Sequence, residues 1–286
     1  MDGIVIVDKP AGWTSQDVTA KLRGVFQTRR IGHGGTLDPM ATGVLPVFVG
    51  RATRGVEFFE HAEKTYEAVL RLGMTTDTED ISGTVLEEKP VCITEAEFLA
   101  SLEAFRGEIQ QIPPMYSALK VNGQKLCDLA RKGKEVERKP RTITIHALEC
   151  LEFTGTTARL LVRCSKGTYI RTLCKDIGQA LGCGGCMEAL RRVSAGAYTI
   201  DEAIPLATLI EAADPATYLR GVDTMFTQYP AVTLTANQET RCRNGNAFTV
   251  NLDQGTYRAY SAGGEFLMLA SVDSGVMSTI KSFFSV

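Results

Sequence analysis

The chain has 286 residues, of which 44% are hydrophobic and 22% are charged, and its formal net charge is −2. Such a chain can bury a substantial core, in one large domain with a small one or in two comparable domains. The charge excludes a uniformly basic nucleic-acid binder, so a nucleic-acid-binding surface would have to be local. No stretch is apolar for long enough to span a bilayer, and the first residues lack the charged region of a secretory signal. We therefore expect a cytoplasmic protein without a membrane segment.

The eight cysteines form no metal motif. A cytoplasmic chain keeps its thiols reduced, and the one CxxC pair is Cys183 with Cys186. A zinc site needs four ligands, and neither a second CxxC pair nor an HxxxH pair supplies the other two. We therefore expect no metal, and small thiols packed around a glycine-rich helix end.

The first predicted elements are a strand, a helix and a glycine-rich loop. Ile4–Val7 is a short apolar run typical of a buried strand. A helix follows, for which Thr14 is the expected N-cap and Asp17 its capping-box partner. Residues 32–43 hold too many glycines for regular structure and therefore predict a loop.

Two strands and a second helix come next. The strands are expected at 44–49 and 66–72, and Thr94–Glu97 is a capping box that opens a helix ending at Gly107. Its spacing predicts a buried face made of Phe98, Leu99, Leu102 and Phe105.

Residues 112–141 differ in character from the rest of the chain. They begin with the helix-breaking Ile112–Pro114, and a short helix is expected near 124–132. Between residues 120 and 141 stand eight basic residues and three acidic ones. A solvated loop is one interpretation, but the lack of balancing acid favours a surface that faces phosphates.

The second half of the chain predicts a hairpin, a helix and a small β module. Strands are expected at 142–153 and 158–164, followed by a helix after Gly167. Residues 199–225 are acidic and rich in alanine, which indicates a connector or an outer helix. From Val232 onward, turn signals separate short strands, which indicates a small module made of strands alone. Four residues of this helix are expected to face the core: Ile170, Leu173, Ile177 and Leu181.

The glycine-rich loop is the sharpest chemical feature. Its first two glycines have the spacing of a dinucleotide site, but Leu37 stands where the third should be and no acid follows at the required distance. A Walker loop is excluded because no Lys-Ser/Thr pair follows the glycines. What remains is a single carboxylate, Asp38, between Thr36 and Pro39. Local pattern alone favours a turn-capping role for it, since Asp-Pro commonly starts a turn.

Three other residues have two interpretations each. Arg171 lies in the first turn of its helix, where the macrodipole disfavours a cation, so it either pairs with an anion or lies on the surface. Tyr66 at a strand start either packs in the core or forms a platform for a base. His33 is a loop anchor or a catalyst, and no nucleophile elbow supports a hydrolase.

Taken in order, these segments resemble the TruB family of bacterial tRNA pseudouridine synthases over about residues 3–198. The resemblance is specific because seven blocks occur in the family's order. The blocks are Gly3–Ser15, Gly32–Pro46, Lys64–Tyr66, Gly73–Thr78, Pro114–Lys120, Cys164–Leu173 and Leu190–Arg192. The tail from Val232 is similar, more weakly, to a PUA domain.

The resemblance implies an α+β fold with a central mixed, largely antiparallel β-sheet flanked by helices. It places the catalytic domain at 1–225, with 112–141 as a flexible RNA-binding insertion, and a small barrel-like PUA domain at 232–286. The implied reaction converts uridine to pseudouridine in the T-loop of tRNA, at position 55, on a flipped-out base. The change needs neither redox chemistry nor phosphate energy, so no cofactor is expected.

The resemblance also implies a role for each candidate residue. Asp38 is the expected nucleophile, and Arg171 is the partner that keeps its carboxylate ionised. Tyr66 is expected to stack on the uracil and assist removal of the C5 proton. The remaining substrate-binding candidates are Tyr169 and Leu190 in the uracil pocket, His33 against the RNA, and Lys9 as phosphate or structural support.

Two other functions remain open at this point. A non-catalytic RNA-binding protein would use the same surface but would have no use for Asp38, which repels phosphate. A glycosidic-bond hydrolase would need a second carboxylate or a metal to activate water. As partners we expect the T-arm of tRNA and no obligate protein, and we expect a monomer.

Overall fold

The computed structural model describes residues 1–121 and 123–284. Within them a ten-stranded sheet has the main order β14-β1-β3-β12-β4-β11-β10-β7, with β2 beside β3 and β13 beside β12. Neighbouring strands are antiparallel except for the pairs β1–β14 and β3–β12. The mixed, largely antiparallel sheet is therefore as predicted. The strands are β1 (Gly3–Lys9), β2 (Ile31–His33), β3 (Thr42–Val49), β4 (Lys64–Leu72), β7 (Gly107–Gln111), β10 (Arg141–Phe153), β11 (Thr157–Cys164), β12 (Gly185–Ala195), β13 (Tyr198–Thr199) and β14 (Ile204–Pro205).

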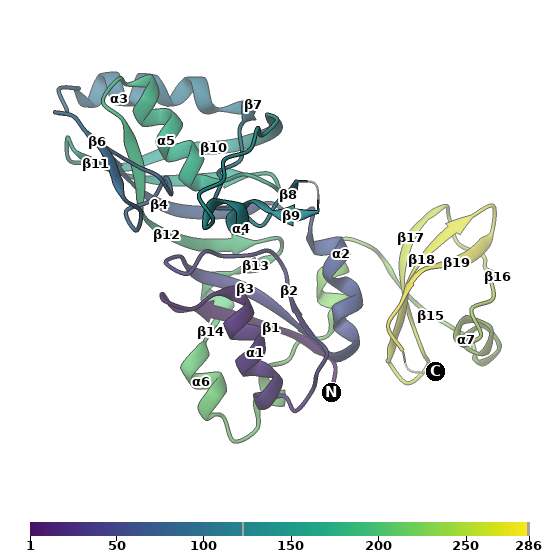
Figure 1. Cartoon of the computed structure of the whole chain (residues 1–286). Coiled ribbons are helices and arrows are strands. Elements are labelled where there is room, and N and C mark those ends of the chain that lie inside the picture. Colours follow the sequence, from purple (N-terminus) through teal and green to yellow (C-terminus); the bar gives the residue numbers. More distant parts are fainter. Residues whose placement is uncertain (122, 285–286) are drawn as a thin grey trace.

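Helices cover both faces of this sheet. The helices α1 (Ser15–Val25), α3 (Glu95–Leu102), α5 (Ile170–Ala180) and α6 (Leu206–Glu211) share one apolar cluster with the sheet. Figure 1 shows α3 and α5 over the half with β4, β10 and β11, and α1 with α6 over the half with β1 and β3. On the other face, α2 (Val56–Phe59) closes a second cluster. In β1, Val5 and Val7 enter the first cluster while Ile4 and Ile6 enter the second, which explains the unbroken apolar run.

The C-terminal part is a five-stranded sheet with the order β15-β17-β18-β19-β16 and its own apolar cluster. It lies beside α2 in Figure 1 and confirms the predicted small β module. Its boundary at 232–286 stays a prediction, and residues 285–286 lie outside those described. Its elements are β15 (Ala231–Thr233), α7 (Ala236–Arg243), β16 (Phe248–Thr249), β17 (Gly255–Tyr260), β18 (Phe266–Asp273) and β19 (Val276–Ser282).

The segment at 112–141 forms a short hairpin and a helix above the middle of the sheet. The hairpin pairs β8 (Lys120–Val121) with β9 (Gln124–Lys125), and α4 (Leu126–Ala130) follows. The short helix near 124–132 is thus confirmed. A second hairpin pairs β5 (Met74–Thr76) with β6 (Val85–Glu88).

Capping chemistry sets the helix starts as predicted. The Thr14 side chain accepts a hydrogen bond from the backbone N–H of Asp17, and the Asp17 carboxylate accepts one from the backbone N–H of Thr14. Thr94 does the same with Glu97 at the start of α3. Each box satisfies two backbone donors that a helix start otherwise leaves unpaired.

Two expectations were wrong, and a third is reduced to one of its two alternatives. Leu99 is 43% exposed rather than buried, because α3 covers the sheet edge with a narrow stripe that includes Phe98 and Leu102. Residues 199–225 form the expected connector and not a single outer helix, as a series of short elements: β14, α6 and the 3₁₀ turns Ile200–Glu202, Pro215–Tyr218 and Val222–Phe226. The tail is not purely β, since it contains α7. None of the helices in the described residues is both long and apolar enough to cross a membrane.

Candidate active site

A cavity of about 810 Å³ opens over the middle of the sheet. The loop between β2 and β3 forms one wall, the starts of β4 and α5 another, and the 112–141 segment lies across it. Of the seven candidate residues, five line this cavity, although they come from four separate segments of the chain. These are Asp38, Tyr66, Tyr169, Arg171 and Leu190.

Hydrogen bonds to Gly12 and Ser15 hold the backbone of the loop that carries Asp38. Ser15 Oγ lies 2.8 Å from the backbone nitrogen of Leu37 and accepts its N–H. The backbone N–H of Gly12 donates to the carbonyl of Pro39 at 2.8 Å. Asp38 therefore lies between two anchored residues, and its side chain is left free to face the cavity.

Two glycines with left-handed backbone allow the loop to turn. Gly35 has φ 89° and Gly43 has φ 100°. A Cβ at Gly43 would lie 2.2 Å from the carbonyl oxygen of Arg192, so no other residue fits there. The close contact between β3 and β12 therefore requires glycine at position 43.

Asp38 and Arg171 form an ion pair in the cavity. Arg171 Nε lies 2.9 Å from Asp38 Oδ2, with the arginine side chain 6% exposed and the aspartate side chain 35% exposed. Among the described residues, no backbone N–H donates to the Asp38 carboxylate, so the hydrogen bond of a turn-capping aspartate is missing. The ion pair with a nearly buried guanidinium holds the carboxylate in one place.

The other nitrogens of Arg171 are also occupied. Its Nη1 donates to the carbonyl of Thr78 at 3.1 Å and lies 3.8 Å from Asp80 Oδ2. Its Nη2 donates to the carbonyl of Tyr116 at 2.8 Å. The guanidinium thus joins the Asp38 loop, the β5–β6 turn and the 112–141 segment, and its planar fork suits several fixed acceptors.

Tyr66 lies on the cavity floor with a charged neighbour that sequence reasoning missed. The tyrosine is 8% exposed, and burial raises the pKa of its phenol. Opposite it on β12 stands Arg192, which is 1% exposed and donates to the carbonyls of Val44 at 2.6 Å and Gly35 at 3.0 Å. The floor therefore combines a neutral aromatic ring with a fixed cation.

Tyr169 and Leu190 complete the apolar wall. Leu190 is 8% exposed and comes from β12. Tyr169 is the N-cap of α5 without a side-chain cap, and its main chain is held by Gln111, which accepts its N–H at 2.8 Å and donates to its carbonyl at 3.0 Å. Gln111 is 2% exposed, so this pairing is sheltered from water.

Lys9 lies beneath the loop and outside the cavity lining. Its residue is 0% exposed, and its Nζ donates to the carbonyls of Pro10, Trp13 and Pro39. Burial lowers the pKa of Lys9 to about 8, and the Asp38 carboxylate acts against that shift. Of the two expected roles, the geometry fits structural support of the loop and not a phosphate contact, because all three donors are used.

His33 also lies outside the cavity lining. Its Nε2 is 3.3 Å from Gln16 Nε2, whereas its Nδ1 is buried without a hydrogen-bond partner among the described residues. Burial, together with Arg192, lowers the pKa of His33 and favours the neutral ring. It therefore contributes no fixed positive charge, and its expected contact with RNA stays a prediction.

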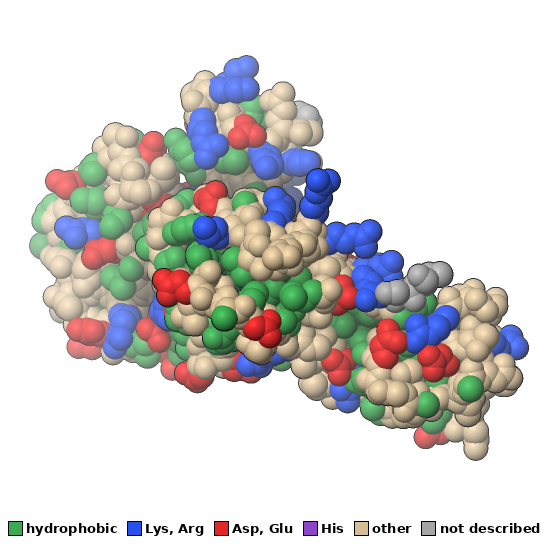
Figure 2. All heavy atoms as spheres, turned by 90° about the horizontal axis from the view of Figure 1, so that it is seen from below, with side chains coloured by type: hydrophobic (Ala, Val, Ile, Leu, Met, Phe, Trp, Pro, Cys, Tyr) green, Lys and Arg blue, Asp and Glu red, His purple; other side chains and the backbone are tan. Residues whose placement is uncertain are grey.

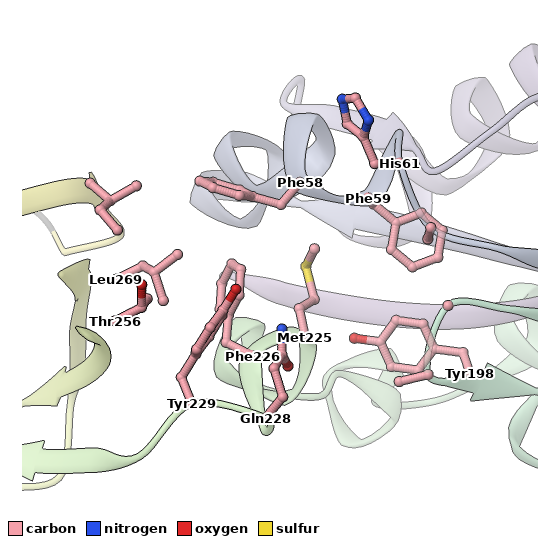
Figure 3. Close-up of a pocket in the computed structure, with 14 residues that line it drawn as sticks. Phe58, Phe59, His61, Tyr198, Met225, Phe226, Gln228, Tyr229, Thr256 and Leu269 are labelled. Atoms are coloured by element: carbon pink, nitrogen blue, oxygen red, sulfur yellow. The ribbon is translucent and has the colours of Figure 1, made fainter. Parts of the chain in front are cut away.

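A second cavity, of about 470 Å³, lies between the sheet's α2 side and the C-terminal part. Figure 3 shows Phe58 of α2 across from Phe226 and Tyr229, with Leu269 and Thr256 of the C-terminal sheet at one end. It contains none of the seven candidate residues. Its aromatic packing instead attaches the C-terminal sheet to the larger one.

The described residues contain no group of three or more His, Cys, Asp and Glu side chains arranged to hold a metal ion. Cys183 and Cys186 are both buried, and the Cys183 Sγ lies 3.4 Å from the carbonyl of Gly184. These thiols pack beside the end of α5, as expected for small thiols around a glycine-rich helix end.

Comparison with solved structures identifies the class of fold. Among solved structures, a Cbf5–Nop10–Gar1 complex contains a chain that is 26% identical, with a TM-score of 0.74 and coverage of 99% of this chain and 85% of that one. An H/ACA ribonucleoprotein bound to a substrate RNA contains another with the same TM-score at 23% identity, which bears on the fold alone. The protein has a pseudouridine-synthase fold of the Cbf5/TruB type.

Sequence relatives narrow the class to one family. The family model described as "TruB family pseudouridylate synthase (N terminal domain)" matches residues 23–170, and "tRNA pseudouridylate synthase B C-terminal domain" matches 171–222. The tRNA pseudouridine synthase B of Dechloromonas aromatica is 45% identical over 92% of this chain and 89% of its own length. That of Clostridium kluyveri is 42% identical over 99% and 100%. The chain belongs to the TruB family of pseudouridylate synthases and is an enzyme of that class.

Proposed function

We propose that this enzyme isomerises uridine to pseudouridine at position 55, in the T-loop of tRNA, with Asp38 as its nucleophile. The observation that carries the proposal is the ion pair between Arg171 Nε and Asp38 Oδ2, 2.9 Å long, in a cavity large enough for a flipped-out nucleotide. The tRNA pseudouridine synthase B relatives, similar over nearly the whole chain, support the choice of substrate.

The reaction breaks the bond between C1′ and N1 of the uracil and forms a bond between C1′ and C5. The C5 proton leaves and N1 gains one, so atoms balance without an oxidant or an energy source. Attack on the base, attack on C1′ and proton removal from C2′ each require an ionised carboxylate beside the nucleotide. Asp38 supplies a carboxylate in the cavity, with its Oδ2 2.9 Å from Arg171 Nε.

The other residues bind the nucleotide in this proposal. Tyr66 stacks on the uracil, and its raised pKa keeps the ring neutral. Tyr169 and Leu190 exclude water from the base. Lys9 supports the Asp38 loop through its bond to the carbonyl of Pro39. His33 contacts the RNA outside the uracil pocket.

The proton balance gives a direct test. A tRNA transcript labelled with tritium at C5 of uridine should release one tritium per molecule, and a transcript with cytidine at position 55 should release none. Release of free uracil would indicate the hydrolase instead. Tight tRNA binding with neither release would indicate the non-catalytic RNA-binding protein.

The RNA-binding surface is proposed to include the exposed Lys and Arg side chains of the 112–141 segment. Figure 2 shows Lys and Arg side chains on the upper lobe of that view and along the surface between this lobe and the C-terminal sheet. Lys132, Lys134 and Lys139 are exposed and, in the described part of the chain, have no carboxylate within ion-pair distance. The C-terminal part, predicted at 232–286, is proposed as a second RNA-binding module, and the whole enzyme as a cytoplasmic monomer without an obligate protein partner.

Neutralising these three lysines together to Gln should weaken tRNA binding roughly tenfold or more and flatten its salt dependence by about two units of slope. The fold should not change, because none of the three side chains packs in a core. A binding titration at several salt concentrations measures both quantities. The matched control replaces Arg71, Lys89 and Arg159 with Gln; these residues do not line the cavity, and each has a carboxylate partner. Equal effects of the two triple variants would contradict a local RNA surface.

A further inference from the structure

Glu79 is a buried carboxylate that the proposed chemistry does not use. It is 8% exposed and lies against the helix that presents Arg171. Its Oε2 accepts from Thr172 Oγ1 at 2.6 Å, and its Oε1 accepts from Lys175 Nζ at 2.7 Å. Both donors therefore belong to α5, one directly after Arg171 and the other one turn further along.

The main chain of Glu79 is held in an uncommon conformation. Its φ is 65°, in the left-handed region that favours glycine. The carbonyl of Glu79 accepts from the backbone N–H of Met187 on β12 at 3.0 Å, and the residue's own N–H donates to Thr76 at 3.3 Å. A large side chain is uncommon in such a conformation, and contacts with the surroundings can stabilise it. Here the two bonds of the carboxylate provide that restraint.

The residues on either side of Glu79 contact Arg171, the ion-pair partner of Asp38. The carbonyl of Thr78 accepts from Arg171 Nη1, and the carboxylate of Asp80 lies 3.8 Å from the same nitrogen. The Asp80 backbone is itself tied by Thr76 Oγ1, 2.7 Å from its carbonyl. The turn Thr78–Asp80 is thus attached to α5 twice, through Glu79 on one side and Arg171 on the other.

We propose that Glu79 is a positioning residue for the reaction. Its carboxylate fastens the Thr78–Asp80 turn to Thr172 and Lys175 of α5. The turn then presents the Thr78 carbonyl and the Asp80 carboxylate to Arg171 at a fixed distance. Arg171 in turn holds Asp38 at the angle that the reaction requires, and small misplacements of a reacting group are costly to the rate. This inference rests on the proposed role of Asp38.

The experiment replaces Glu79 with glycine. Glycine adopts φ 65° without strain, so the turn keeps its shape while the carboxylate is lost. The rate of pseudouridine formation in a single turnover should fall by roughly ten- to a hundredfold, while the dissociation constant for tRNA stays that of the wild type. The matched control is Gln27→Gly, which changes an exposed residue with φ 48° and should leave the rate unchanged.

A second pair of variants tests the other end of the contact. Lys175 is about one third exposed at its side chain, so Lys175→Met should fold and should lower the rate several-fold through loss of one bond to Glu79. Lys175→Arg keeps the charge and should restore most of the rate. A wild-type rate in Glu79→Gly or in Lys175→Met would overturn the proposal, as would a loss explained wholly by weaker tRNA binding or by unfolded protein.

The outcome separates this inference from the proposed function. If Asp38→Asn remains active, the proposed role of Asp38 fails, whatever the Glu79 variants do. If Asp38→Asn is inactive and Glu79→Gly matches the wild type, only the positioning role of Glu79 fails.

Discussion

Replacing Asp38 with asparagine should abolish pseudouridine formation, with a fall in single-turnover rate of roughly 10⁴-fold or more. Asparagine keeps the size of the side chain, and the loop remains anchored through Leu37 and Pro39. The amide cannot act as a nucleophile or base, and it removes the nearer of the two carboxylates beside Arg171. The dissociation constant for tRNA should change little, because binding depends mainly on phosphate contacts elsewhere.

The control for this variant is Asp17→Asn. Asp17 is an exposed aspartate whose carboxylate completes the capping box of α1. Its replacement should lower the melting temperature slightly and leave the rate unchanged. Single-turnover rate, tRNA affinity and melting temperature of both variants measure the difference. Substantial turnover by Asp38→Asn would show that Asp38 only shapes its loop.

The second large effect is expected from Arg171→Lys. A lysine carries one compact charge, whereas the guanidinium reaches Asp38, the carbonyl of Thr78 and the carbonyl of Tyr116 together. The ammonium can retain the Asp38 contact only by leaving one or both carbonyls unpaired, so the carboxylate loses its fixed direction. We expect a rate lower by roughly a hundredfold. The free energy of unfolding should fall by about 1–3 kcal/mol, from the buried acceptors left unpaired.

Arg191→Lys is the matched control for that change. Arg191 pairs with Asp8 at 2.9 Å, but its side chain is 40% exposed and it does not line the cavity. Exposed ion pairs contribute little, so its replacement should leave the rate unaltered. If both arginine variants lose activity equally, or Arg171→Lys turns over like the wild type, the geometry at Arg171 is not what positions Asp38.

Local elements could be predicted from the sequence where one signal determined them. Thr14 and Thr94 each begin a capping box, and both helices start there. The apolar run at Ile4–Val7 is a strand because both faces of the sheet are covered. The basic segment at 112–141 was recognised from charge, which does not depend on tertiary contacts.

The central strand β12 had no comparable signal. Its side chains do not alternate regularly, because the pairing with β4 shifts between Met187 and Ala189 and again between Arg192 and Ser194. Each irregularity exchanges the faces to which later side chains point. A strand in the middle of the sheet therefore resembles an irregular segment in the sequence. The exposed Leu99 is the opposite case, where spacing indicates burial and the narrow helix stripe leaves it outside.

The same distinction applies to the site. The pairing of Asp38 with Arg171 could be expected from the resemblance, because local pattern alone favours a turn-capping role for Asp38 and leaves Arg171 with two interpretations. Arg192 and Asp80 were missed, although both stand in or beside quoted motifs, because no local pattern shows that a charged side chain is buried. Arg192 is 1% exposed and Asp80 is 5% exposed only after β3, β12 and the β5–β6 turn have come together.

The central claim is that this enzyme makes pseudouridine at one uridine of the tRNA T-loop through Asp38. The most direct measurement is incubation of unmodified tRNA with the wild type and with Asp38→Asn, followed by mapping of pseudouridine at single-nucleotide resolution. The account predicts one modified site, position 55, with the wild type and none with the variant. Modification by the variant, or wild-type modification only at other positions, would contradict it.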